Sequence, residues 1–359
     1  MLHDYQDELL SFLRKDFKTL TVVVMPDFFL DRLVNLNYDK DFFADVEDVA
    51  QRKGGSIDGI DQVELRGGNA INTASALAAL GLKVTPIVCT SRLGLQLIDF
   101  YLKQYNVDTS HTKIFEKPSI TTALEFKTKN GKVNVMLRDL GSLADFGPSD
   151  INNEDFKLIE NADYVCLFNW AGTKSFGTQL AETVFRYMKT KGKGKTYYDT
   201  ADPNPNKEKI PDLMKNVLQT QHVDILSVNE NEAICYASQV SDKIRDFQKS
   251  LPFDELAIVA ARILAKHLSA RVDLHTTSFS ATFTKKGETV VPAFKVPVLR
   301  ATGAGDAWNA GNILGDGHGL SDSCRLALAN AVAAYYISNP DGTHPTRKQL
   351  LGFIQNSRS

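Results

Sequence analysis

A short glycine-rich segment near the C-terminal end combines the residue types of a phosphate site with those of a general base. The segment is Gly303-Ala304-Gly305-Asp306, and a run of small, helix-forming residues follows it. Glycines leave backbone N–H groups open, so those at the start of the predicted helix can bind an anion, and the helix dipole adds partial positive charge. A carboxylate beside a phosphate is repelled by it, which favours Asp306 as a base that takes a proton from an attacking hydroxyl. A helix-capping role for Asp306 is the alternative.

A second segment of this kind lies in the N-terminal third, at Gly67-Gly68-Asn69-Ala70-Ile71-Asn72. Its paired glycines allow a ligand to approach the backbone closely. Asn72 lies one helical turn later, where its amide offers a donor and an acceptor to a polyol. The alternative is a plain glycine turn followed by an Asn at the start of a helix.

Buried strands and helices alternate along the chain and predict the elements that position these segments. Apolar runs at residues 21–25, 84–89, 163–168, 196–199 and 223–228 indicate buried strands, and residues 293–299 indicate a further strand before Gly303. Residues 70–80, 178–189 and 211–218 indicate helices between them. This order predicts an α/β fold with a mainly parallel sheet covered by helices on both faces.

Two stretches break this alternation and predict a small additional sheet. Residues 28–36 continue beyond the first strand, and residues 123–128 and 133–137 alternate in polarity around Asn130-Gly131. Asn-Gly between two alternating runs is a strong signal of a β-hairpin. We expect these insertions to form a β-rich lid; the alternative is an edge hairpin on the main sheet.

The composition excludes several classes of protein. Of 359 residues, 43% are apolar and 23% charged, with 41 Lys and Arg against 43 Asp and Glu. This balance argues against a nucleic-acid partner, and no apolar run reaches membrane-spanning length. Residues 1–17 have the pattern of an amphipathic helix and not of a signal peptide. Four widely spaced cysteines fit reduced thiols better than disulfides or zinc, which predicts a cytoplasmic protein.

Together the two glycine segments resemble the two signatures of the ribokinase-like (PfkB) carbohydrate kinase family. The first matches Gly-Gly-x-x-x-Asn with a later Leu80-Gly81 turn, and residues 302–311 match the second. Asn229 and Glu232 match the Asn-x-x-Glu element between them. The resemblance covers residues 20–354 and implies a three-layer fold with a small β-sheet lid. The lid would comprise residues 27–66 and 118–140, and the α/β domain residues 1–26, 67–117 and 141–359.

The resemblance also implies roles for individual residues, with ATP and Mg²⁺ as the cofactors. Asp306 would be the catalytic base, and the N–H groups of Gly303, Ala304 and Gly305 the anion hole. Asp31, Gly68 and Asn72 would bind the hydroxyl groups of the substrate. Asn229, Thr302 and Asn330 would bind the nucleotide, with Asn229 near its phosphates and Asn330 near adenine. Glu232 would hold Mg²⁺ through water. Asp199 or Asp202 is either a neighbour of the magnesium or a solvated loop residue.

Two arginines bear on the cation and on the substrate. Arg300 occupies the position where many family members have the Asp of a potassium site, so we expect its guanidinium to replace the monovalent cation, which would then not be required; the alternative is an exposed side chain. Arg138, in Leu137-Arg138-Asp139-Leu140-Gly141-Ser142, resembles the Arg of members that act on acidic sugars, ketodeoxygluconate kinases among them. A guanidinium suits a carboxylate or sugar phosphate, and an exposed strand-end Arg is the alternative.

The sequence therefore predicts an ATP-dependent kinase that phosphorylates a hydroxyl of a sugar or sugar acid. Two alternatives remain: a nucleoside kinase of the same family, and a weakly active ligand-binding or regulatory protein with a kinase fold. The altered loop at residues 275–280, where the family often has Thr-x-Gly, is the only support for the second alternative. The exposed strands of the lid also favour a homodimer formed through the lid.

Overall fold

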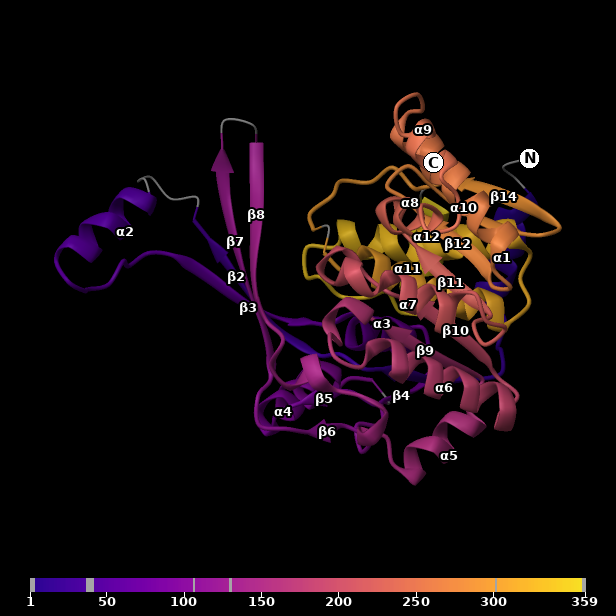
Figure 1. Ribbon diagram of the computed structural model, residues 1–359, viewed down its shortest axis with the longest axis horizontal. Helices are drawn as coiled ribbons and strands as arrows, with labels where there is room; N and C mark the ends of the chain where they lie inside the picture. Colours follow the sequence, from indigo (N-terminus) through magenta and orange to yellow (C-terminus); the bar gives the residue numbers. More distant parts are fainter. Residues whose placement is uncertain (1–3, 37–41, 106, 129–130, 301, 357–359) are drawn as a thin grey trace.

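The central feature of the fold is a mainly parallel sheet (Figure 1). The computed structural model describes residues 4–36, 42–105, 107–128, 131–300 and 302–356, and within them this sheet has eight strands. Five pairings are parallel, and the last two hairpin pairings are antiparallel. In spatial order the strands are β14 (Gly287–Pro292), β13 (Phe279–Thr284), β12 (Arg271–His275), β11 (Ile225–Val228), β10 (Lys195–Asp199), β9 (Tyr164–Phe168), β1 (Thr21–Met25) and β4 (Lys83–Pro86).

Helices cover both faces of this sheet and enclose one apolar core on each side. Alternate residues of β1 enter different cores, Val23 and Met25 on one face and Val22 and Val24 on the other. The first core is completed by α5 (Asn153–Asn161), α6 (Gly177–Lys191), α7 (Ile210–Leu213), α8 (Glu230–Ala237), α9 (Lys243–Phe247) and α10 (Phe253–His267). The second is completed by α1 (Asp4–Arg14), α3 (Asn69–Ala79), α4 (Arg92–Leu102), α11 (Ala304–Gly317), α12 (Asp322–Ser338) and α13 (Arg347–Asn356).

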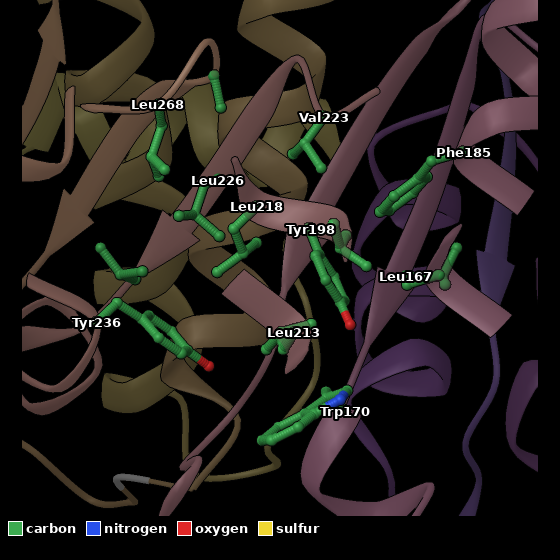
Figure 2. Packing of buried hydrophobic residues seen from close by; sticks show 14 of the residues in the cluster. Leu167, Trp170, Phe185, Tyr198, Leu213, Leu218, Val223, Leu226, Tyr236 and Leu268 are labelled. Atoms are coloured by element: carbon green, nitrogen blue, oxygen red, sulfur yellow. The ribbon is translucent and has the colours of Figure 1, made fainter. Parts of the chain in front are cut away.

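Large aromatic side chains fill the first core (Figure 2). Phe185 of α6 meets Tyr198 of β10 edge to face, with ring centroids 5.2 Å apart. Trp170, 2% exposed, donates its indole N–H to Oγ1 of Thr178 over 3.0 Å, so burial leaves no unpaired donor on the indole. This packing fixes the strands whose C-terminal ends carry the polar residues described below.

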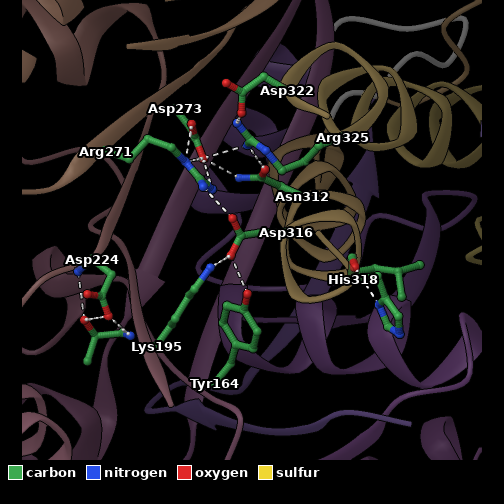
Figure 3. A network of polar contacts seen from close by, with 12 residues as sticks. Tyr164, Lys195, Asp224, Arg271, Asp273, Asn312, Asp316, His318, Asp322 and Arg325 are labelled. Carbon is green, nitrogen blue, oxygen red and sulfur yellow. Dashed lines mark hydrogen bonds and ion pairs between the residues drawn. The ribbon is translucent and has the colours of Figure 1, made fainter. Parts of the chain in front are cut away.

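A buried polar network ties the sheet to the helices on its other face (Figure 3). Asp273 of β12 accepts hydrogen bonds from Arg271 and Arg325, and Asn312 of α11 donates to it over 2.9 Å. Arg271 also contacts Asp316, the acceptor of Tyr164 and Lys195. The two arginines hold the pKa of Asp273 well below its usual range. α11 and α12 are thereby locked to the sheet.

A separate four-stranded sheet stands away from the main sheet (Figure 1). Its order is β3 (Asp61–Gly67), β2 (Phe29–Asn35), β7 (Ser119–Thr128) and β8 (Gly131–Asp139), and we call it the lid sheet. A helix, α2 (Phe42–Gln51), projects from it without a buried residue. A small two-stranded sheet joins β5 (Cys89–Thr90) and β6 (Lys113–Ile114).

The structure confirms the α/β fold and corrects parts of the sequence prediction. The hairpin joins the lid sheet, where β7 pairs with β2 and β8 pairs with β7, so the edge-hairpin alternative is wrong; Asn130 of its turn lies outside the described residues. Residues 293–299 form no strand, since Pro297 lacks the N–H for a ladder, and the strand is instead β14. Residues 211–218 combine the short α7 with a π-turn.

Two further observations concern the chemistry of the surface and interior. All four cysteines are free thiols. In the described part of the chain, no helix has both the length and the apolar character needed to cross a bilayer.

Candidate active site

The start of helix α11 presents open backbone N–H groups, as its sequence predicts. Gly303 caps the helix with φ 86°, a left-handed conformation that disfavours other residues. A Cβ at this position would lie 2.8 Å from the hydroxyl of Tyr336, so the glycine also permits a close approach to α12. The amides of Ala304, Gly305 and Asp306 lie in the first turn, where helical partners are absent and an anion is favoured.

Asp306 is held by two amides from another helix. Asn69 Nδ2 donates to Oδ1 of Asp306 over 2.8 Å, and Asn72 Nδ2 donates to Oδ2 over 3.0 Å. Both asparagines belong to α3, which begins after Gly68 with φ 92°, so the two glycine segments meet at their helix N-termini. Asp306 is 5% exposed. Both groups that donate to its carboxylate belong to α3 and not to α11, which argues against a role in capping α11.

The surroundings of the Asp306 carboxyl favour its protonated form. Its pKa is raised to about 8, chiefly by burial. The hydrogen bonds from Asn72 and Asn69 lower this pKa. The negative charges of Asp199 and Asp27 raise it further. A carboxyl poised in this range can accept a proton near neutral pH once positive charge enters the site.

The lid sheet brings three polar residues into one row. Asp31 of β2 is in register with Thr121 of β7, which is in register with Arg138 of β8, so the three lie on one face. Arg138 lies over the Phe29 ring at 5.1 Å. Burial raises the pKa of Asp31 to about 6, while the hydrogen bond with Thr121 and the charge of Arg138 lower it. The carboxylate packs against Gly67, where a Cβ would come within 2.2 Å.

A cavity of about 880 Å³ is bordered by Asp306. It is lined by the predicted base, by the predicted anion hole, and by residues predicted for the nucleotide and Mg²⁺: Asp306, Gly303, Ala304, Gly305, Asn229, Asn330 and Glu232. Asp199 and Asp202 line it too, as do the ring of His275 and the ring of Trp308, whose centroids are 5.0 Å apart. The volume suits a ligand of nucleotide size.

The carboxylates in this cavity fit a cation brought in by a ligand. Asn229 and Glu232 form a reciprocal cap of α8, with Asn229 Nδ2 donating to Glu232 Oε1 over 2.8 Å. Burial and the charge of Asp199 raise the pKa of Glu232 well above its usual value, with Asp202 adding to the effect. No cluster of three or more metal-ligating side chains occurs among the described residues. Mg²⁺ usually keeps waters and phosphate oxygens beside one or two carboxylates, so these residues fit a magnesium–nucleotide complex.

Asn330 and Thr302, both predicted to bind the nucleotide, do not offer free polar groups to the cavity in the way the sequence suggested. Both polar atoms of the Asn330 amide are used within the fold, since Trp308 Nε1 donates to Oδ1 over 2.9 Å and Nδ2 donates to the Pro292 carbonyl over 3.1 Å. Asn330 therefore shapes the cavity wall. Thr302 is exposed just before the helix cap.

The sequence comparison decides the family. Residues 39–349 match the pfkB family of carbohydrate kinases. The chain belongs to this family. Its enzymes transfer a phosphoryl group to an alcohol acceptor. No curated protein sequence matches the chain significantly.

Solved structures of pfkB-type kinases share the fold of this family member. Adenosine kinase from Sinorhizobium meliloti has a TM-score of 0.70 at 18% identity, covering 95% of this chain and all 100% of its own. Ribokinase from Arabidopsis thaliana, complexed with ribose and ATP, has a TM-score of 0.70 at 19% identity, covering 94% and 99%. Fructokinase from Xylella fastidiosa with bound ATP has a TM-score of 0.69 at 15% identity, covering 94% and 99%. At these identities the likeness establishes the fold.

This pfkB kinase also contains site residues that the sequence analysis did not assign. Asn69 directly follows the predicted Gly68, and its position at a helix start was the available signal. His275 lies in the altered loop and Trp308 within the second signature, but neither was assigned a role, and the contact of their rings beside the cavity depends on the tertiary fold. Arg66, directly before Gly67, donates Nε to Oδ1 of Asn72 over 3.2 Å.

Proposed function

We propose that this kinase uses ATP to phosphorylate a hydroxyl group of a sugar or sugar acid, with Asp306 as catalytic base. The observation that carries the proposal is the position of Asp306. Its buried carboxyl lies in the first turn of α11, between the nucleotide-sized cavity and the α3 amides that border the lid. A base there can reach a hydroxyl that attacks the terminal phosphate of a nucleotide.

In this mechanism the chain's own residues orient the acceptor and receive its proton. Asp31, Asn72 and the backbone at Gly68 bind hydroxyl groups of the acceptor, and Asp306 takes the proton of the attacking oxygen. The N–H groups of residues 303–306 stabilise the charge that develops on the transferred group. Glu232, acting through water, would hold Mg²⁺ with Asn229 nearby, and the ion when bound would neutralise phosphate charge. Closure of the lid sheet would exclude water and so limit ATP hydrolysis.

The substitution Asp306→Asn tests the base. It removes the proton acceptor at almost unchanged volume, so kcat should fall by roughly 10²–10⁴-fold while ATP still binds. Turnover and nucleotide affinity, the latter by calorimetry, provide the measurement. Near-normal turnover in a correctly folded variant would refute the assignment.

For the acceptor, we infer an acidic sugar from Arg138. Its guanidinium lies in the same row as Asp31, where it can pair with a carboxylate or phosphate of the substrate. A nucleoside acceptor is the second candidate, because an adenosine kinase and a nucleoside kinase from Methanocaldococcus jannaschii are among the structural neighbours. ADP release measured with a panel of sugars, sugar acids and nucleosides separates the two, with the highest kcat/KM expected for a sugar acid.

We further propose that Arg300 replaces a bound monovalent cation. Its Nη2 donates to the Pro340 carbonyl over 2.7 Å, and its guanidinium lies 5.9 Å from the Tyr336 ring centroid. A Cβ on Gly342 would come within 1.8 Å of Arg300 Nη1, so the glycine makes room for the guanidinium. The fixed positive charge of Arg300 would satisfy a backbone carbonyl oxygen that a potassium ion could otherwise coordinate.

The lid is proposed to comprise residues 27–66 and 118–140, with the α/β domain formed by residues 1–26, 67–117 and 141–359. We propose a homodimer formed through the lid, supported by exposed apolar side chains on the face that carries Asp31, namely Val63, Leu65 and Met136, which are 52%, 38% and 50% exposed. Burying such side chains against a second lid would stabilise the pair. Light scattering across micromolar concentrations should give a dimer, and a monomer throughout would contradict the proposal.

A further inference from the structure

Arg66 is a partly buried guanidinium held by neutral groups. It lies at the end of β3, and its Nε donates to Oδ1 of Asn72 over 3.2 Å. Its Nη2 donates to Nδ1 of His344 over 3.1 Å. Both of these acceptors are uncharged. The Asn72 side chain is an amide, and burial and the charge of Arg66 keep the pKa of His344 well below its ordinary value. Withdrawing a guanidinium from water without a carboxylate partner is costly, which argues that its charge serves the site.

The contact with Arg66 determines how the Asn72 amide is turned. A guanidinium can only donate, so the Asn72 atom that faces it must be the oxygen. The amide nitrogen of Asn72 is then directed at Asp306, to which it donates over 3.0 Å. Asn72 is 7% exposed, so solvent offers few competing partners for the amide. Without Arg66 the amide loses the partner that selects this orientation.

His344 fixes the guanidinium from its far side. The imidazole is 2% exposed and stacks on Tyr336 with ring centroids 4.6 Å apart. Its Nδ1 also lies 3.1 Å from the hydroxyl of Ser75, which belongs to the same helix as Asn72. Since Nδ1 accepts from Arg66, the ring cannot carry a proton there. The guanidinium is therefore held between two neutral acceptors and has little freedom to turn.

Four of the titratable groups that interact electrostatically with Asp306 lie on different elements of the fold. Asp199 of β10 and Asp27, in the loop after β1, repel its negative form. Tyr336 of α12 interacts with it at longer range. Arg66 is the fourth and interacts favourably with the carboxylate. Its positive charge therefore offsets the repulsion by the two acidic residues.

From this geometry we propose that Arg66 is a positioning residue for the phosphoryl transfer. It orients the Asn72 amide that holds Asp306, and its fixed charge favours the ionised form of that carboxylate, which is the form that accepts a proton. The inference rests on the proposed role of Asp306 as base. It adds to that role a residue that lies outside both glycine segments and acts through a neighbour.

The pH profile of kcat/KM tests the proposal with two substitutions. Arg66→Gln keeps a donor for Asn72 but removes the charge, so the limb on which activity rises with pH should move up by about half a unit to one unit, with activity at neutral pH lower by about 3–10-fold. Arg66→Lys keeps the charge but loses the planar fork, so the limb should stay in place while kcat falls. ATP affinity and melting temperature, measured in parallel, show whether each variant is folded.

Arg32→Gln is the matched control, since Arg32 is an exposed lid residue on the neighbouring strand and is paired with Glu64. Its profile should coincide with that of the parent enzyme. The Arg66→Lys and Asn72→Ala substitutions combined should cost much less than the sum of the two, because both interrupt the path through Asn72 to Asp306. Additive losses, or an unmoved limb in folded Arg66→Gln, would overturn the inference.

Two outcomes separate this inference from its premises. If Arg66→Gln raises only the KM of acidic acceptors and leaves the limb in place, Arg66 binds the substrate and the positioning role is wrong. If Asp306→Asn retains turnover, the base assignment itself fails, whatever the Arg66 variants do.

Discussion

Asn69 donates its side-chain amide to Asp306 over 2.8 Å, although the two residues belong to opposite halves of the sequence. With Asn72 on the second oxygen, the carboxylate of α11 is held entirely by helix α3. The base of the proposed reaction is therefore oriented by side chains of the protein itself, and preorganisation of this kind lowers the cost of reaching the transition state.

The activity of the enzyme should rise with pH. Asp306 has a pKa raised to about 8, so at lower pH it is protonated and cannot accept a proton from the acceptor hydroxyl. We expect kcat/KM to increase along a single limb centred near that value and then to level off. Measurement from about pH 6 to about pH 10 at constant ionic strength checks this. A profile that is flat over the whole range would contradict the base assignment.

Replacing Gly303 by Ala should impair both the fold and the reaction. The residue has φ 86°, and the new Cβ would lie 2.8 Å from the Tyr336 hydroxyl. Left-handed strain costs about 1–2 kcal/mol, and displacement of the loop should lower kcat as well. The matched control is Gly319→Ala, which has φ 66° but open space around the Cβ. It should lose similar stability and keep its turnover; equal turnover in both variants would argue against an anion hole at Gly303.

Removal of Arg138 should discriminate between acceptors. Arg138→Ala should raise the KM of an acidic sugar by roughly 10–100-fold, as expected for a lost charge-assisted hydrogen bond, and leave that of a neutral sugar nearly unchanged. Steady-state kinetics with a matched acid and neutral pair provide the measurement. Arg32→Ala, another lid arginine whose partner is Glu64, controls for a general loss of positive charge. Equal effects on the KM of both sugars would show that Arg138 does not bind the acidic group of the substrate.

Turnover should be nearly independent of potassium. Because Arg300 already donates to the Pro340 carbonyl, exchanging K⁺ for Na⁺ or choline at fixed ionic strength should leave kcat unchanged. Arg300→Ala removes that donor and should lower kcat in every salt. Strong activation of the parent enzyme by K⁺ over both controls would show that a cation site exists despite the arginine.

The buried network behind the sheet should contribute strongly to stability. Asp273 lies between Arg271 and Arg325, and Asp273→Asn would remove one of the two carboxylate partners of each guanidinium, at a cost of about 3 kcal/mol. Asp246→Asn, at an exposed carboxylate, should change the unfolding free energy by less than about 0.5 kcal/mol. Denaturant titrations measure both, and equal stabilities would contradict the assigned weight of the network.

The same network predicts how stability depends on pH. The pKa of Asp273 is lower in the folded protein than in the unfolded chain. Its contribution to the free energy of unfolding is therefore fully present above the unfolded pKa and is lost as the pH falls from that value through the folded pKa. The parent enzyme should therefore lose stability more steeply in acid than Asp273→Asn does. Parallel curves for the two proteins would contradict this.

Local features were predictable because they depend on few neighbouring residues. The turn at Gly303 and the first turn of α11 follow from glycines before a helix, and α3 after Gly68 follows in the same way. The alternating apolar runs predicted the parallel strands, because such runs bury both sides of a strand. The strand expected at residues 293–299 was wrong because its apolar pattern was weighed without the missing N–H of Pro297, which a β-ladder needs.

The sequence by itself determined the fold class, the two glycine-capped helix starts and the placement of an acid in one of them, because backbone conformation is set by local sterics and hydrogen bonding. Only the tertiary structure decided what touches that acid. The amides of α3 reach Asp306, Arg66 reaches Asn72, and the Asn330 amide is used within the cavity wall. These contacts join residues far apart in the chain, and they depend on how α3 and α12 pack against α11, which no local pattern specifies.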